Sequence, residues 1–272
     1  MKLLRPCLGF AAVLALAGSL LAQSASGLPK GKVELFLLAG QSNMAGRGAV
    51  ADLAPADAAA DPRVWALNKD GAWQPAMDPL HWDKAGSGVG SGKFFGRIIA
   101  AKKPGVIVAL IPTACGGSPI GTWVPGAYWE QTKSHPWDDS IARAKRALQD
   151  GGTLKAVLWH QGESDSNAKN APLYEKNLTD LINRFRKEFN APELPFIIGQ
   201  LGRFDAEGKP WGSGQIEVDR AQRAVAAKMP HVYFVSAEGL VSKGDKLHFS
   251  TASQKTLAEH YAEAYLKSQS AR

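Results

Sequence analysis

Short apolar runs alternate with longer amphipathic stretches along most of the chain. Five of the runs are continuous and rich in Val, Ile, Leu and Phe, as is typical of parallel strands that are buried on both faces. The predicted strands are Val33–Leu38, Val106–Ile111, Leu154–Trp159, Phe196–Gly199 and Val232–Ser236. Because alternating strands and helices imply crossover connections, the sequence predicts an α/β fold, a three-layer α/β/α sandwich with a five-stranded parallel sheet.

The amphipathic stretches between these runs have the period of helices. The predicted helices are Gly92–Lys102, Asp138–Gln149, Pro172–Phe189, Ile216–Lys228 and Thr251–Leu266. The last one opens with Thr251 and Gln254, a spacing that predicts a capping box. No internal repeat or low-complexity linker interrupts the pattern, so a single domain is expected.

The N-terminal segment differs from the rest of the sequence. Lys2 and Arg5 precede an apolar run from Leu8 to Leu21, and small residues follow the run, as in a secretory signal peptide. The run holds about 14 residues, whereas a membrane-spanning helix needs about 20. The sequence therefore predicts a signal peptide at 1–22, one domain at 23–272, a secreted or periplasmic location, and no membrane span in the mature chain.

Composition and charge narrow the possible partners. With 45% hydrophobic residues the chain can bury one sizeable core. The net charge is +7, but the basic residues are scattered, with groups at 143–146, 176–187 and 243–246. A nucleic-acid partner would need a concentrated basic stripe, so none is expected, and at most the charge favours an acidic polysaccharide.

Cys115 is the one cysteine of the mature chain, which excludes an internal disulfide. The sequence leaves the oligomeric state unknown.

Polar and small residues follow the first three predicted strands, where each strand ends. They are Gln41, Ser42 and Asn43 after the first strand, Cys115, Gly116 and Gly117 after the second, and Gln161, Gly162 and Glu163 after the third. The carboxyl ends of parallel strands meet at one edge of a sheet, where α/β proteins bind their ligands. The sequence therefore predicts a functional site at this edge.

Ser42 has the setting of a nucleophile. The segment Gly40-Gln41-Ser42-Asn43-Met44 puts its hydroxyl on a tight turn directly after a buried strand, although such a serine is more often a turn or cap residue. Asp245 and His248 supply the corroboration. A carboxylate three residues before a histidine can hold Nδ1 and leave Nε2 free to take the hydroxyl proton. Ser42, Asp245 and His248 together predict nucleophilic catalysis.

Nucleophilic attack on an ester also needs hydrogen-bond donors for the oxyanion. The expected donors are the Ser42 amide, the Gly90 amide in the glycine-rich segment 86–92, and the Gln161 side chain. The glycine-rich segment fits neither Gly-x-Gly-x-x-Gly nor the phosphate-binding loop, because Phe94 follows Gly92-Lys93. Nucleotide binding is therefore not expected.

Cofactor and metal chemistry have no sequence support. The six histidines are scattered, and no His-Glu-x-x-His or paired-Cys spacing is present. The segment 162–166, Gly-Glu-Ser-Asp-Ser, ends in Ser where the nucleophile elbow of α/β-hydrolases has Gly. We expect no cofactor and no metal.

Four short blocks of the sequence belong together: 40–44 (GQSNM), 89–92 (VGSG), 159–165 (WHQGESD) and 245–250 (DKLHFS). In these blocks the sequence resembles the SGNH-type carbohydrate acetylesterases, in the branch that holds sialate O-acetylesterases and acetylxylan esterases. The resemblance implies a flavodoxin-like three-layer fold without cofactor, with Ser42 as nucleophile, His248 as base and Asp245 as its orienting partner. It also implies that Gln161 takes the oxyanion role that Asn has in the wider superfamily, which favours a carbohydrate over a lipid substrate.

The resemblance leaves several roles open. Gln41, Asn43 and Glu163 are expected to support the site or bind substrate, and Arg47 has no assigned role. Four tryptophans outside the predicted strands could stack on sugar rings or pack under loops: Trp82, Trp123, Trp129 and Trp137.

The expected function is removal of O-acetyl groups from xylan, sialic acid or another glycan. The alternatives are a noncatalytic sugar-binding protein on the same fold and a lipid- or thioester-directed hydrolase.

Overall fold

The structure, a computed structural model, describes residues 27–270, so the predicted signal peptide at 1–22 lies outside the described residues. Within 27–270, seven strands form one sheet in the order β3-β2-β4-β1-β5-β6-β7. The strands are β1 (Lys32–Gly40), β2 (Val64–Leu67), β3 (Trp73–Pro75), β4 (Val106–Pro112), β5 (Thr153–His160), β6 (Phe196–Gly199) and β7 (Val232–Val235). All pairs are parallel except the edge pair of β2 and β3.

The α/β class is confirmed, but the predicted number of five strands is wrong. All five predicted strands are present, and β2 and β3 extend the sheet beyond β4. β2 is a run of only four apolar residues, and β3 has three residues, of which two are exposed. Such short segments are weak strand signals in a sequence, because pairing with a neighbour defines them more than their own composition does.

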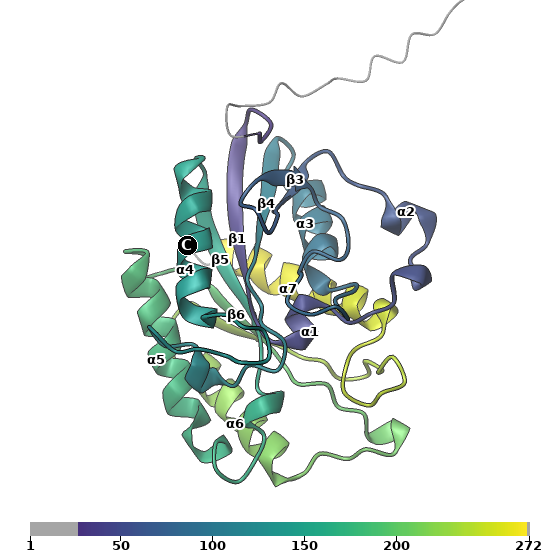
Figure 1. Ribbon diagram of the computed structural model, residues 1–272, viewed down its shortest axis with the longest axis vertical. Coiled ribbons are helices and arrows are strands. Elements are labelled where there is room, and N and C mark those ends of the chain that lie inside the picture. The colour runs from purple at the N-terminus through teal and green to yellow at the C-terminus, as the bar shows by residue number, and fades with distance from the viewer. Residues whose placement is uncertain (1–26, 271–272) are drawn as a thin grey trace, which may run out of the picture.

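Helices cover both faces of the sheet (Figure 1), and the predicted three layers are present. Within the described range the α-helices are α1 (Ser42–Ala45), α2 (Pro55–Ala58), α3 (Ser91–Lys102), α4 (Pro136–Gln149), α5 (Tyr174–Glu188), α6 (Ser213–Lys228) and α7 (Thr251–Ser270). Short 3-10 helices occupy Val50–Asp52, Ile120–Thr122, Glu163–Asp165, Ala171–Leu173 and Asp205–Glu207. Helices α4, α5 and α6 cover one face of the sheet, and α3 and α7 cover the other.

Alternating side chains of the central strand β1 build the two cores. Leu35 and Leu37 belong to the core under α4, α5 and α6, whereas Phe36 and Leu38 belong to the core under α3 and α7. Successive side chains of a strand point to opposite faces, so a strand that is apolar at every position must be covered on both sides. This explains why β1 is an unbroken apolar run in the sequence. The residues that follow β1 lie at the carboxyl edge of the sheet, where this buried strand ends.

The N-terminus of α7 is capped differently from the expectation. Ser250 Oγ accepts a hydrogen bond from the Ser253 amide at 3.2 Å, in the manner of an N-cap serine. Thr251 and Gln254, the pair predicted to form the capping box, make other hydrogen bonds. Thr251 Oγ1 donates to the Ala49 carbonyl, and Gln254 Nε2 donates to the Asn43 carbonyl. The capping-box prediction is therefore wrong, because both side chains are used to attach α7 to the loop after β1.

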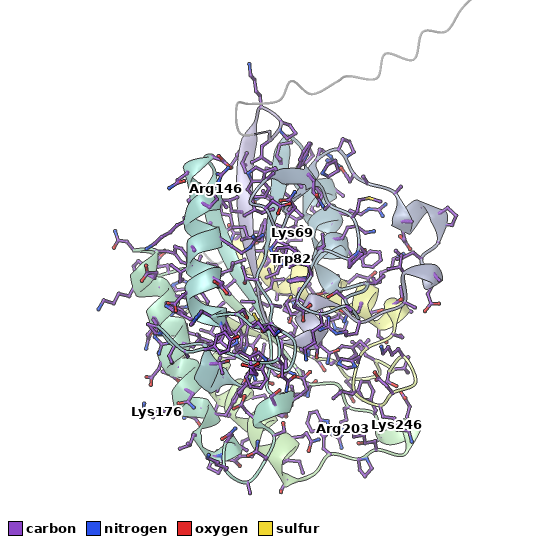
Figure 2. All side chains as sticks on the ribbon, in the orientation of Figure 1. Lys69, Trp82, Arg146, Lys176, Arg203 and Lys246 are labelled. Carbon is purple, nitrogen blue, oxygen red and sulfur yellow. The ribbon has the colours of Figure 1, made fainter. Side chains whose placement is uncertain are left out.

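The labelled basic side chains are distributed over the molecule in Figure 2. Arg146 and Lys176 lie apart from each other, and Arg203 and Lys246 lie together at the lower right of that view. In the part of the chain that the structure describes, each helix is too short or too polar to cross a bilayer.

Candidate active site

The chain leaves β1 through a turn that only glycine fits. Gly40 has φ 128°, and a Cβ at this position would lie 2.2 Å from the carbonyl oxygen of His160 at the end of β5. The Gln41 amide donates to the same carbonyl at 2.8 Å. This close approach of β1 and β5 places Ser42, at the start of α1, on the carboxyl edge of the sheet.

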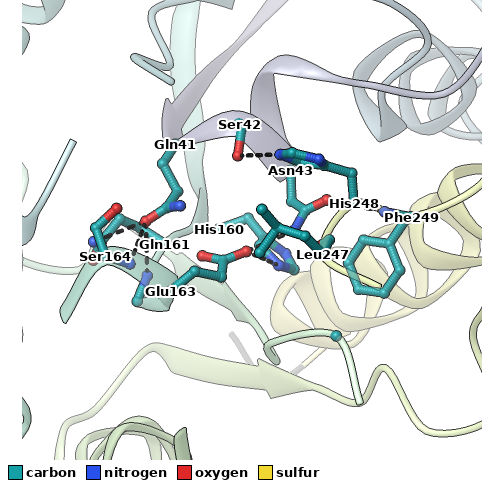
Figure 3. Close-up of polar contacts among 12 residues, drawn as sticks. Gln41, Ser42, Asn43, His160, Gln161, Glu163, Ser164, Leu247, His248 and Phe249 are labelled. Atoms are coloured by element: carbon teal, nitrogen blue, oxygen red, sulfur yellow. Dashed lines mark hydrogen bonds and ion pairs between the residues drawn. The ribbon is translucent and has the colours of Figure 1, made fainter. Parts of the chain in front are cut away.

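Ser42, His248 and Asp245 form a continuous chain of hydrogen bonds. Figure 3 shows the bond between Ser42 and His248. His248 Nε2 lies 3.0 Å from Ser42 Oγ, and His248 Nδ1 lies 2.7 Å from Asp245 Oδ2. Since an ionised carboxylate only accepts, Nδ1 carries the hydrogen and Nε2 of the neutral ring accepts from the serine hydroxyl. The structure thus brings together the three residues that the sequence singles out.

The spacing of three residues between Asp245 and His248 has a second effect. Asp245 Oδ1 accepts from the amides of Leu247 and His248 at 2.9 and 2.7 Å, so the carboxylate closes the loop that carries the histidine. Burial opposes ionisation, but these amides and the His248 ring together lower the pKa of Asp245. The carboxylate is therefore charged at neutral pH and fixed in place.

Asn43 ties the two halves of the site together. Its Nδ2 donates to Glu163 Oε1 at 2.6 Å and to the Leu247 carbonyl at 3.1 Å, and its Oδ1 accepts from the Phe249 amide at 3.1 Å. Asn43 thus holds both neighbours of His248. Burial raises the pKa of Glu163, which lies against Asn43 and has no contact with Ser42 among the hydrogen bonds of residues 27–270. The geometry gives Asn43 and Glu163 a supporting position.

Arg47, which has no role from the sequence, belongs to a buried ion pair with Asp83. Its Nη2 lies 2.6 Å from Asp83 Oδ2, and both side chains are less than a tenth exposed. The same carboxylate oxygen accepts from the Gly116 amide at 2.8 Å. Arg47 and Asp83 therefore join the loops that follow β1 and β4. Sequence reasoning missed Asp83, because a lone Asp in a loop carries no signal of its partner.

Gln161 lies beneath the site and not in it. Its side chain is fully buried, and Nε2 donates to Gln41 Oε1, to the Ser118 carbonyl and to Asp165 Oδ2. No N–H of this amide is left for a substrate oxygen. The sequence-based expectation of an oxyanion donor at Gln161 is therefore not met by this geometry, because neighbouring acceptors from other segments occupy it.

Gly90 lies beside the helix that begins with the nucleophile. It is the residue before α3, and a Cβ built on it would lie 3.2 Å from the Met44 carbonyl oxygen and from Gly46 Cα. Burial raises the pKa of Asp78, and the Gly90 amide acts against that rise. The part of Gly90 as an oxyanion donor stays a prediction.

The four loop tryptophans divide into two groups. Trp123 and Trp137 are 0% and 3% exposed and pack in the core, so stacking on a sugar is excluded for them. Trp129 is half-buried and donates to the Gly116 carbonyl, and Trp82 is exposed, with the Arg143 guanidinium 4.5 Å from its ring. Of the four, Trp82 and Trp129 keep a surface that a glycan could reach.

A serine hydroxyl bonded to a neutral imidazole, itself held by a carboxylate, can attack an acyl carbon and transfer the proton to the leaving group. Among residues 27–270 no three His, Cys, Asp or Glu side chains lie close enough to hold a metal ion. The fold and this geometry are those of a carboxylic ester hydrolase.

Comparison with known proteins gives the family. Residues 32–267 match the family described as carbohydrate esterase, sialic acid-specific acetylesterase. The chain belongs to this family. It is 33% identical over 251 residues to a probable carbohydrate esterase of Arabidopsis thaliana, covering 86% of this chain and 90% of that protein.

Structural similarity agrees with the sequence match. An X-ray structure of a protein from Arabidopsis thaliana superposes with a TM-score of 0.76 at 32% identity, covering 86% of this chain and 98% of that one. A sialate O-acetylesterase of Pongo abelii is 27% identical over 233 residues, which are 73% of this chain and 42% of that protein. The chain thus spans less than half of this second relative.

Proposed function

We propose that the protein is a serine esterase that removes O-acetyl groups from a carbohydrate through an acetyl-enzyme. Ser42 is the nucleophile, His248 the general base and Asp245 the residue that orients it. The observation that carries this assignment is the unbroken line of hydrogen bonds from Asp245 through His248 to Ser42. The family of acetylesterases supports the acetyl group as the acyl part of the substrate.

The proposed reaction has two steps. Ser42 Oγ bonds to the acetyl carbon while His248 Nε2 takes the hydroxyl proton, and the same imidazolium returns the proton to the departing sugar oxygen. Water then attacks the acetyl-enzyme with His248 again as base, which releases acetate and restores the serine. The Ser42 amide, at the start of α1, is available to the oxyanion, because the first N–H groups of a helix have no partner within it.

The proposed substrate is an acetylated glycan of the xylan or sialic acid type. Support comes from the family and from the sialate O-acetylesterase named among the relatives. Of the four loop tryptophans, Trp82 and Trp129 retain some exposure, and indole rings stack well on sugars.

Acetate release from p-nitrophenyl acetate, acetylated xylan and O-acetylated sialic acid tests the function. The wild type should release acetate, and Ser42→Ala should lower kcat by about 10⁶-fold while the protein remains folded. Activity on one of the two glycans identifies the sugar. If the wild type binds both glycans and releases no acetate from any ester, the esterase function is wrong.

We further propose that the protein is exported, either to the periplasm or out of the cell, after removal of residues 1–22. The charged start and the apolar run before Ala22 support this location. Fractionation of the producing cells, followed by the intact mass of the protein, is the direct test. A full-length protein in the cytosolic fraction would contradict export without affecting the enzymatic proposal.

A further inference from the structure

The side-chain amide of Gln41 is fixed in one orientation. Its Oε1 accepts hydrogen bonds from Gln161 Nε2 at 3.1 Å, from the Gly162 amide at 3.4 Å and from the Ser164 amide at 3.3 Å. An amide nitrogen cannot accept a hydrogen bond, so the oxygen must face these three donors. Nε2 of Gln41 therefore points the other way.

The network below Gln41 is complete and buried. Gln161 Oε1 accepts from Tyr174 Oη at 2.9 Å, and Gln161 Nε2 donates to Asp165 Oδ2 at 2.6 Å and to the Ser118 carbonyl at 3.1 Å. These bonds also fix the orientation of the Gln161 amide, which presents an N–H to Gln41. Gln161 is 0% exposed, and so it can act on a substrate only through Gln41.

The nitrogen of Gln41 is turned away from this network. Figure 3 shows the Gln41 oxygen turned toward Ser164 and the nitrogen turned toward the side where Ser42 and His248 lie. Nε2 makes no hydrogen bond to any residue of 27–270. Side-chain atoms of this range that lack a partner and are also buried do not include Nε2, so this nitrogen is accessible to solvent. The small exposed part of Gln41 therefore includes this N–H group.

We propose that Gln41 Nε2 is the side-chain donor to the oxyanion and that Gln161 is a positioning residue for it. This inference rests on the proposed function. As Ser42 Oγ bonds to the acetyl carbon and its proton passes to His248, the carbonyl π pair moves onto oxygen. The Gln41 N–H and the Ser42 amide stabilise that charge. Rotating the Gln41 amide away would break three hydrogen bonds, so the donor is in place before the reaction begins.

The first test is Gln41→Glu, which preserves the shape and the accepting oxygen but replaces the N–H donor with a second oxygen. We expect kcat for p-nitrophenyl acetate to fall by about 10²–10³-fold with little change in KM. Gln200→Glu is the matched control. Gln200 is also buried and follows β6, where its Oε1 accepts from the Ala237 amide and its Nε2 donates to Asp219. This control should keep the kcat of the wild type.

A second measurement separates donation from structural support. The substrate is p-nitrophenyl thionoacetate, in which sulfur replaces the carbonyl oxygen and accepts hydrogen bonds weakly. In Gln41→Glu the ratio of kcat/KM for the oxygen ester to that for the thionoester should fall by about tenfold or more, because the lost donor acted on oxygen. Misfolding would lower both rates together and leave the ratio unchanged. Gln41→Glu with a normal kcat and a normal ratio overturns the proposal.

The role of Gln161 is tested in the absence of the Gln41 amide. Adding Gln161→Met to Gln41→Met should cause no further fall in the oxygen-to-sulfur ratio, since Gln161 acts through Gln41. If Gln161 donates directly, the ratio falls further in the double variant, and the proposal is wrong.

Diethyl p-nitrophenyl phosphate distinguishes failure of this inference from failure of the proposed function. Ser42 Oγ attacks phosphorus, His248 takes the proton and p-nitrophenolate leaves, so the phosphoryl oxygen probes the same donors without an acetyl ester. If the wild type hydrolyses no acetyl ester but Gln41→Glu slows this labelling, the substrate proposal fails and the Gln41 role stands. Normal labelling of Gln41→Glu refutes the Gln41 role, and a wild type that neither hydrolyses esters nor is labelled refutes both.

Discussion

The protonation of His248 is set by opposing influences around a single ring. Burial lowers its pKa, Asp245 raises it, and the positive charges of Arg47 and Lys243 lower it further. The net direction is downward from about 6.5, the ordinary value for histidine. His248 is therefore neutral at pH 7, the form that can accept the proton of Ser42.

The pH dependence of kcat/KM follows from this direction. A base with a lowered pKa stays active below pH 6.5 and loses activity as the pH falls through its own pKa. We expect an acidic limb whose midpoint lies below about 6.5. Hydrolysis of p-nitrophenyl acetate between pH 4 and 8 measures it, and a profile that is flat down to pH 4 is incompatible with His248 as the base.

Asp245→Asn tests the orienting role of the carboxylate. The amide can present its N–H to His248 Nδ1 and so stabilise the wrong tautomer, and it cannot stabilise the imidazolium. We expect kcat to fall by about 10³–10⁴-fold with the fold intact. Asp180→Asn, at an exposed position of α5 that pairs with Lys176, is the control and should retain full activity. Comparable activity in both variants would rule out Asp245 as the orienting residue.

Ser42, Asp245 and His248 could be predicted from the sequence because each carries a local signal. A serine follows a strand and a glycine, and the Asp-x-x-His spacing can be seen in one short segment. Gln161 and Gly90 could not be placed in the same way. Whether the Gln161 N–H groups are free depends on Gln41 and the Ser118 carbonyl, which approach from other segments, and the surroundings of Gly90 depend on how the start of α3 packs against α1.

At the scale of elements, the close approach of β1 to its parallel neighbour β5 positions the nucleophile. Gly40→Ala puts a methyl group 2.2 Å from the His160 carbonyl oxygen and forces an unfavourable φ on alanine. We expect the free energy of unfolding to fall by about 3 kcal/mol or more, with loss of activity, because neither backbone can give way easily. Urea denaturation followed by circular dichroism measures this change.

Gly105→Ala provides the control for the backbone strain alone. Gly105 has φ 82°, and no atom lies within 4 Å of a Cβ built there. The expected loss is about 1–2 kcal/mol with normal activity. If the two variants are equally stable, the close approach of β1 to β5 is not the reason for glycine at position 40.

The elements themselves were predictable to the extent that they are long and buried on both sides. The central strands and helices α3 to α7 have enough residues to show a period of two or of 3.6. Strands β2 and β3 do not, and the pairing of β3 with β2 and of β2 with β4 is a property of the assembled sheet. The prediction was therefore accurate from β4 to β7 and failed at the β3 end of the sheet.

At the scale of the whole molecule, buried histidines limit stability in acid. Burial lowers the pKa of His160 to about 3 and that of His81 to about 4. Each binds a proton more readily in the unfolded chain, whose histidines titrate near about 6.5, so protonation favours unfolding as the pH falls below that value. The buried carboxyls of Asp78 and Glu163, whose pKa values are raised, act in the opposite direction.

His160→Gln isolates the contribution of one of these histidines. Between pH 7 and pH 5 the wild type should lose about 2 kcal/mol more unfolding free energy than the variant does, because glutamine takes up no proton. Urea titrations of both proteins at the two pH values give this difference directly. Equal losses would show that His160 is protonated in the folded protein or that its burial carries no electrostatic cost.

Ser42 and His248 are 206 residues apart in the chain although their side chains are in contact. A ribosome therefore completes β1, the sheet and most of the helices before it adds the base. In the proposed mechanism Ser42 is activated only after the loop before α7 has brought His248 to it. The proposal therefore implies that a polypeptide terminated before residue 248 folds without a base for its nucleophile.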